Sequence, residues 1–96
     1  MWALFSVKKL IENLRKTGFR VLSILYKNKR LRFKEIEEYA ELSYLATYRT
    51  VSQLFLYGLV CIFSEGREVE LTDAGRRVFE YLLDAGYILH IFGGSF

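Results

Sequence analysis

The sequence predicts a mainly helical domain that carries one small β-hairpin. Three observations support this fold class. Apolar residues recur at helical spacing over residues 3–16, 44–57 and 71–86. Residues 59–71 instead alternate in hydrophobicity around a Glu-Gly pair, as the two strands of a hairpin do. The chain has 96 residues, of which 52% are hydrophobic, and this is enough for one packed core but not for two.

The N-terminal third is expected to form two helices. The first covers residues 3–16, and its apolar stripe consists of Leu4, Val7, Ile11 and Leu14. Thr17–Gly18 should end this helix, because glycine is the usual residue just after a helix C-terminus. Residues 19–27 should form a second helix that buries Val21, Leu22 and Leu25.

Residues 28–43 predict a short strand, a short helix and a turn. The run NKRLRF interrupts the helical pattern, and Leu31–Phe33 is a candidate for a very short strand. The helix is expected over residues 34–41, with Ile36, Tyr39 and Ala40 facing inward. A turn at Leu42–Ser43 follows.

A longer helix is expected over residues 44–57. Ser43 is a good N-cap for it, and Gly58 should end it. On a helical wheel the inward face consists of Thr47, Thr50, Val51 and Leu54. The outward face and one flank consist of Leu45, Arg49, Ser52, Gln53, Leu56, Tyr44, Tyr48 and Phe55.

Residues 59–71 are expected to form the hairpin. Glu65–Gly66 is the predicted two-residue turn, because glycine readily adopts the positive φ that such turns need. Pairing Ser64 with Arg67 also pairs Ile62 with Val69 and Val60 with Leu71. These four apolar side chains then share one face, as a half-buried ribbon requires.

The last helix is expected to begin after Thr72. Thr72 is its predicted N-cap, and Asp73 favours the positive end of the helix dipole. The inward stripe consists of Gly75, Val78, Phe79, Leu82 and Gly86. The apolar tail that follows either extends this helix to about Phe92 or packs against a partner.

This order of elements makes a helix-turn-helix motif followed by a wing. Residues 31–79 resemble the winged helix-turn-helix of bacterial and archaeal transcriptional regulators of the MarR, PadR and ArsR kind. Three stretches carry the resemblance: LRFKEIEEYAELS, YLATYRTVSQLFLYGLV and SEGREVELTDAGRRVF. The resemblance implies a DNA-binding regulator with a single domain. Its parts would be an N-terminal dimerisation helix at 3–16, a helix-turn-helix core and wing at 19–71, and a C-terminal helix at 72–92.

The charges are unevenly distributed along the chain. Residues 1–34 contain ten Lys or Arg and one Glu, whereas residues 35–96 contain four Arg and ten Asp or Glu. Such asymmetry indicates that one face meets a polyanion, and the alternative is a solvated basic face without a partner. The candidate phosphate-binding residues of the basic run 27–34 are Lys29, Arg30, Arg32 and Lys34.

The helix at 44–57 is the candidate for reading bases, because the N-terminal outward residues of such a helix reach base edges. The candidate contacts are Tyr44, Leu45, Tyr48, Arg49, Ser52 and Gln53. Arg can bind guanine through two hydrogen bonds, and Gln can bind adenine in the same way. Arg67 at the wing tip is a candidate for a minor-groove or backbone contact. The alternatives are a solvated charge at Arg49, tyrosines that only pack, and leucines that meet another protein.

No pattern for an enzyme is present. The sequence has no nucleophile with a base partner, no phosphate-binding glycine loop and no metal-ligand spacing, so we expect neither catalysis nor a cofactor. The single cysteine, Cys61, excludes an internal disulfide and a cysteine-based zinc site. A buried thiol and an intersubunit disulfide both remain open for it. No apolar run is long enough to span a membrane, and we expect a cytoplasmic protein.

The sequence therefore predicts a homodimeric regulator that binds specific double-stranded DNA. Apolar residues beyond the needs of a minimal winged helix are expected to form the dimer interface, and these are Leu4, Val7, Ile11, Leu14, Leu82, Leu89 and Phe92. The alternative is that they fold back on their own domain. The alternative function is a winged-helix module for protein–protein interaction with weak or no DNA binding. The operator, the direction of regulation and any small-molecule effector are left open.

Overall fold

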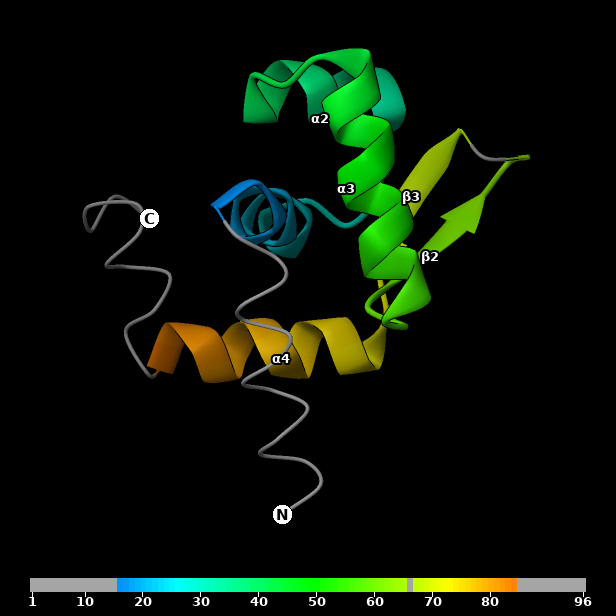
Figure 1. Cartoon of the computed structure of the whole chain (residues 1–96). Helices are drawn as coiled ribbons and strands as arrows, with labels where there is room; N and C mark the ends of the chain where they lie inside the picture. The colour runs from blue at the N-terminus through cyan, green and yellow to red at the C-terminus, as the bar shows by residue number, and fades with distance from the viewer. Residues whose placement is uncertain (1–15, 66, 85–96) are drawn as a thin grey trace.

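The structure is a computed structural model that describes residues 16–65 and 67–84. A helix over residues 16–27 is followed by β1 (Leu31–Arg32), α2 (Phe33–Ala40) and α3 (Tyr44–Leu56). The hairpin strands β2 (Val60–Phe63) and β3 (Glu68–Leu71) come next, and α4 (Asp73–Asp84) ends the described chain. α2 lies near the N-terminal end of α3, and α4 lies beyond its C-terminal end (Figure 1). The mainly helical fold with a small hairpin is confirmed.

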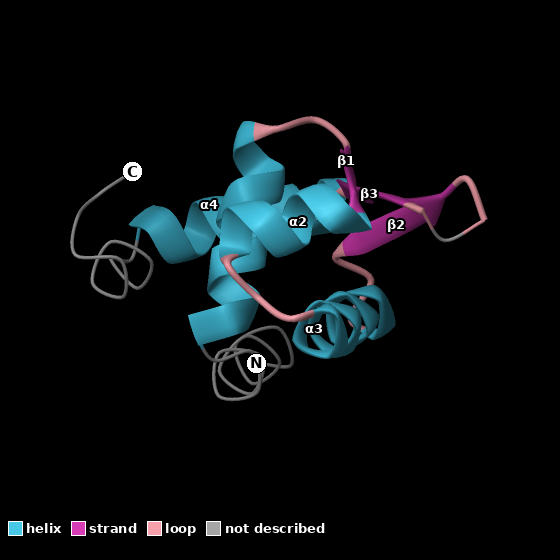
Figure 2. Cartoon of the chain, turned by 90° about the horizontal axis from the view of Figure 1, so that it is seen from above, coloured by secondary structure: helices cyan, strands magenta, loops and turns pink. Residues whose placement is uncertain are grey.

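The three strands form an antiparallel sheet in the order β1-β3-β2. The hairpin register is the one that the sequence predicts, with Val60 opposite Leu71 and Ile62 opposite Val69. The short strand β1 adds to the other side of β3, where Leu31 lies opposite Val69. The β2–β3 hairpin projects from one side of the helices as the wing (Figure 2).

The turn of the wing differs from the predicted two-residue turn. The strands end at Phe63 and resume at Glu68, and the positive φ angles lie at Ser64 and Glu65. The backbone N–H of Arg67 donates to the Phe63 carbonyl across 3.1 Å. The same N–H also lies 3.3 Å from the Ser64 carbonyl, the contact expected of the predicted turn, so the difference is that the left-handed region begins at Ser64, one residue early.

The core lies where the helices meet the inner face of the sheet. The predicted inward residues Val21, Leu22 and Leu25 are buried. So are the four predicted inward residues of α3, Thr47, Thr50, Val51 and Leu54. Val60, Val69 and Leu71 add the inner face of the hairpin. Gly75, Phe79 and Leu82 add the inward stripe of α4.

Two predictions about the helices are wrong. The chain does not leave the helix at Thr17–Gly18, because residues 16–27 are helical and Gly18 is buried. A glycine inside a helix costs only about 1 kcal/mol relative to alanine, which tertiary packing readily offsets. Tyr39 is 55% exposed, because the buried contact of α2 runs through Ile36 and Ala40. Tyr39 lies about 100° around the helix from Ala40 and points to water.

The predicted caps at Ser43 and Thr72 and the predicted helix end at Gly58 are confirmed. Ser43 Oγ accepts a hydrogen bond from the Ala46 N–H at 3.1 Å and so begins α3. Gly58 has a φ of +75° and ends α3, and the Leu59 N–H donates to the Leu54 carbonyl in the manner of a Schellman motif. α2 begins at Phe33, one residue before the predicted start.

The first turn of α4 lies directly against the backbone that follows α3. Thr72 Oγ1 accepts from the Gly75 N–H at 2.9 Å and donates to the Gly58 carbonyl at 2.7 Å. The Thr72 N–H donates to the Leu59 carbonyl at 3.0 Å. A Cβ atom at position 75 would overlap with that carbonyl. Only glycine therefore permits this approach.

We predict that Gly75→Ala lowers the free energy of unfolding by about 3 kcal/mol, since the added methyl group must push α4 away from Leu59. Urea denaturation followed by circular dichroism measures this change. The neighbouring exposed substitution Ala74→Ser is the control, with an expected change within about 0.5 kcal/mol. A Gly75→Ala protein as stable as the wild type would contradict the close approach.

Tyr26 connects the helix over 16–27 to α4. Its hydroxyl donates to Glu80 Oε2 at 2.9 Å, and its ring lies 4.5 Å from the Phe79 ring. The hydrogen bond to Glu80 raises the pKa of Tyr26 above the ordinary value of 10.0, and desolvation and the Glu80 charge act in the same direction. The neutral phenol is therefore the form that the folded state favours.

We predict that the stability contributed by the Tyr26 hydroxyl is fully present below about pH 10 and is lost as the pH rises through the folded-state pKa. Urea denaturation of the wild type and of Tyr26→Phe, from about pH 8.5 to about pH 11.5, measures it. The advantage of the wild type should shrink over this range. Phenylalanine keeps the ring contact, so a constant difference would show that Glu80 does not favour the neutral phenol.

Candidate nucleic-acid interface

The first two turns of α3 present an exposed aromatic surface. Tyr44 and Tyr48 are each more than half exposed and lie one helical turn apart. Their rings are stacked, with centroids 6.4 Å apart and planes inclined by 16°. Leu45 and Arg49 are exposed as well, whereas Ser52 and Gln53, further along the helix, are half-buried. The structure thus places the predicted base-reading residues on the surface, with the N-terminal ones most accessible.

A surface hollow of about 470 Å³ lies beside these tyrosines. It is lined by Arg32, Phe33, Lys34, Glu35, Tyr44, Tyr48 and Arg67. Its cations come from three places in the sequence: the end of β1, the first turn of α2 and the wing turn. The hollow therefore brings together five of the sequence-predicted site residues around the N-terminal end of α3.

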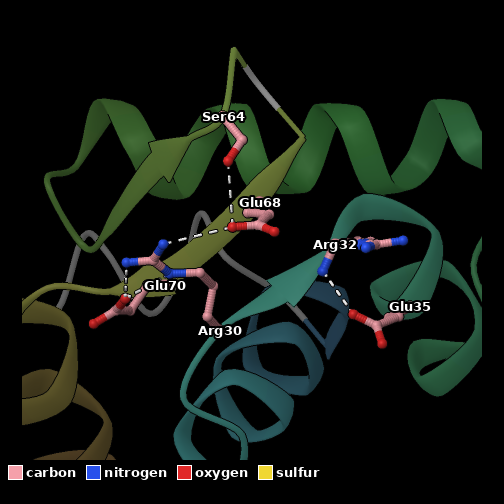
Figure 3. A network of polar contacts seen from close by, with 6 residues as sticks. All are labelled: Arg30, Arg32, Glu35, Ser64, Glu68 and Glu70. Carbon is pink, nitrogen blue, oxygen red and sulfur yellow. Dashed lines mark hydrogen bonds and ion pairs between the residues drawn. The ribbon is translucent and has the colours of Figure 1, made fainter.

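Short backbone links place the basic residues of the hollow. Glu35 Oε1 accepts from the Arg32 N–H at 2.8 Å and caps α2 (Figure 3). The Phe33 N–H donates to the Arg67 carbonyl at 3.0 Å and ties the wing turn to the start of α2. Sequence reasoning did not select Phe33 and Glu35 as site residues. Their position beside Arg32 and Lys34 was the only available signal.

Arg30 lies elsewhere, against the outer face of the wing. Its guanidinium binds Glu70 at 3.0 Å and Glu68 at 3.5 Å (Figure 3). The same group lies 4.0 Å from the centre of the Phe63 ring. Ser64 Oγ lies 3.3 Å from Glu68 Oε1 and completes this network. Arg30 therefore does not join Arg32 and Lys34 at the hollow, although it precedes them directly in the basic run.

Part of the predicted dimer interface can be compared with the structure. Leu82 is fully buried within the single chain, because it lies on the face of α4 that packs in the core. It therefore offers no apolar side chain to a second copy, and its assignment to the interface is corrected. Leu4, Val7, Ile11, Leu14, Leu89 and Phe92 lie outside the described residues.

Other kinds of site were searched for in the described residues. Cys61 is a half-buried free thiol on the outer face of the hairpin. Among residues 16–65 and 67–84, no cluster of His, Cys, Asp or Glu side chains could hold a metal ion. In the same part of the chain, no helix combines the length and hydrophobicity that a membrane span requires.

Solved structures show which proteins this fold resembles. No family model and no curated protein matches the chain. A MarR family transcriptional regulator from Silicibacter pomeroyi DSS-3 is 28% identical, with a TM-score of 0.66, over 75% of this chain and 53% of that one. BpsR from Bordetella bronchiseptica, whose DNA binding is regulated by 6-hydroxynicotinic acid, is 21% identical, with a TM-score of 0.69, over 81% of this chain and 60% of that one.

A third similar structure is NadR in complex with 4-hydroxyphenylacetate. It is 19% identical, with a TM-score of 0.74, over 95% of this chain and 70% of that one. The present chain thus spans from 53% to 70% of the length of these proteins. The sheet order, the α2–α3 pair and these similarities agree. The chain has the winged helix-turn-helix fold of MarR family transcriptional regulators.

Proposed function

We propose that this chain is a transcriptional regulator that binds specific double-stranded DNA as a homodimer. The observation that carries the proposal is the convergence of Arg32, Lys34 and Arg67 with two stacked tyrosines at the N-terminal end of α3. One similar structure is that of a MarR family transcriptional regulator, and another is that of a protein whose DNA binding is regulated, and both support DNA as the partner.

In this proposal α3 enters the major groove. The groove is about 12 Å wide and admits one α-helix. Arg49 then reaches a guanine, while Tyr44, Leu45 and Tyr48 meet thymine methyl groups or phosphates. Ser52 and Gln53 lie further along the helix and contact bases only where the helix enters deeply.

The basic residues around the hollow hold the DNA backbone. Arg32, Lys34 and Arg67 line the hollow, Lys29 lies on the exposed loop before β1, and all four supply charge without selecting a sequence. Glu35 already accepts the N–H of Arg32 and places a negative charge at the start of α2. The phosphate contacts therefore come from the side chains around the hollow rather than from the N-terminus of α2.

A second function has its own supporting observation. Leu45 and Phe55 are about half exposed, and Leu56 is 83% exposed. Phe55 and Leu56 are adjacent in the sequence, and neighbouring exposed apolar side chains favour a protein contact. A winged-helix module that binds another protein through α3, with weak or no DNA binding, is therefore the alternative.

We predict salt-dependent binding to a mixed-sequence duplex of about 20 base pairs, measured by fluorescence anisotropy between about 50 and about 200 mM salt. Replacing Arg32, Lys34 and Arg67 together by Gln should reduce the slope of log K against log salt by about three, since each phosphate contact contributes about one.

Arg77→Gln is the control for this measurement. Arg77 is exposed on α4, which lies beyond the C-terminal end of α3, so its removal should leave the slope nearly unchanged (Figure 1). If the wild type does not bind at the lowest salt, DNA binding is excluded and the protein-binding alternative gains support.

We predict that selection from random DNA returns a pseudo-palindromic site with half-sites about 10 base pairs apart, as expected for a dimer that meets successive major grooves. On this site Arg49→Ala should lose about 1–3 kcal/mol of discrimination at one base pair per half-site. Lys34→Gln should weaken binding to all sequences alike. Unchanged sequence preference in Arg49→Ala would show that Arg49 does not read a base.

A further inference from the structure

Arg30 joins the loop before β1 to both strands of the wing. Its Nε and one terminal nitrogen bind Glu70 at 3.1 and 3.0 Å, and the other terminal nitrogen binds Glu68 at 3.5 Å (Figure 3). Its guanidinium also covers the Phe63 ring of β2. We call these contacts among Arg30, Phe63, Glu68 and Glu70 the Arg30 clasp.

The clasp differs from an ordinary surface ion pair. A single exposed pair contributes little, because solvent screens it and two long side chains lose freedom. Here one planar group binds two carboxylates and an aromatic face at the same time, and this restricts it to one orientation. The Arg30 side chain is 43% exposed, and its two carboxylate partners Glu68 and Glu70 are 29% and 23% exposed.

Among the described residues, the wing has few other attachments near its tip. β1 pairs with β3 through only two residue pairs, Leu31 with Val69 and Arg32 with Glu68. Beyond them, the Phe33 N–H to the Arg67 carbonyl is a single hydrogen bond. The hairpin projects away from the helices (Figure 2). The direction in which Arg67 points therefore depends on what holds β3 against β1, and the clasp spans that junction.

We propose that Arg30 is a positioning residue for DNA binding, which holds the wing so that Arg67 stays beside Arg32 and Lys34 at the hollow. This positioning role rests on the proposed function. It deepens the proposed function by giving Arg30 a role other than phosphate contact. The guanidinium that the basic run offers in sequence is occupied by the two wing glutamates. Its effect on DNA binding passes through Arg67.

A double-mutant cycle tests this role, because side chains that act independently give additive changes. Arg67→Gln is made in the wild type, in Arg30→Gln and in Glu68→Gln/Glu70→Gln, and binding to a mixed-sequence duplex is measured at about 50 mM salt. In the wild type Arg67→Gln should weaken binding by about threefold to tenfold. In the other two backgrounds the loss should shrink to within about twofold, since the wing is no longer held.

Two features of this design separate positioning from charge. Glu68→Gln/Glu70→Gln removes two negative charges, so charge alone predicts tighter binding with an undiminished effect of Arg67→Gln. Lys29→Gln removes one positive charge from the same loop, where Lys29 is exposed, and is the matched control. Arg67→Gln should cost as much in Lys29→Gln as in the wild type. An equal loss in all backgrounds overturns the proposal.

Hydrogen exchange makes the test independent of DNA. Arg30→Gln and Glu68→Gln/Glu70→Gln should each speed exchange of the Phe33 and Arg67 amides by about threefold or more, whereas Lys29→Gln should not. Unchanged exchange overturns the positioning role even where DNA binds. Faster exchange in a chain that binds no duplex supports the clasp and contradicts the proposed function alone.

Discussion

The contact between the first turn of α4 and the Gly58–Leu59 backbone determines where the wing begins and ends. β2 starts one residue after Leu59, and β3 ends one residue before Thr72. Thr72 binds both carbonyls through its hydroxyl and its N–H, and Gly75 has no Cβ atom that would overlap with the Leu59 carbonyl. Both ends of the hairpin are thereby attached to the end of α3, so the wing and α3 form one unit.

The opposite end of α3 is positioned by α2. The Arg20 guanidinium donates a hydrogen bond to the Ala40 carbonyl at 2.8 Å, at the C-terminal end of α2. The helix dipole also favours a positive charge at this end. Ser43 then begins α3 after a short turn. The hollow lies where the start of α2, the start of α3 and the wing turn meet, so its shape depends on both ends of α3. The hydroxyl of Thr47, on the buried face of α3, has no hydrogen-bond partner within the described residues.

Features governed by neighbours in sequence were predictable. The caps at Ser43 and Thr72, the end at Gly58 and the hairpin register follow from short-range rules and were confirmed. Features governed by distant contacts were not. Gly18 remains helical because packing outweighs its low propensity. Arg30 pairs with a residue forty positions away, and the basic run gave no sign of it.

Arg49 is the only charged residue of α3, and the other cations of the proposed interface lie on β1, α2, the loops and the wing. Under the proposed function, the attraction to DNA and the choice of sequence therefore reside in different segments. The exposed positions of α3 could change in a duplicated gene without altering the core face of the helix or the electrostatic attraction to the DNA phosphates. This division would let descendants of the chain diverge toward new operators while each intermediate still folds and still finds DNA.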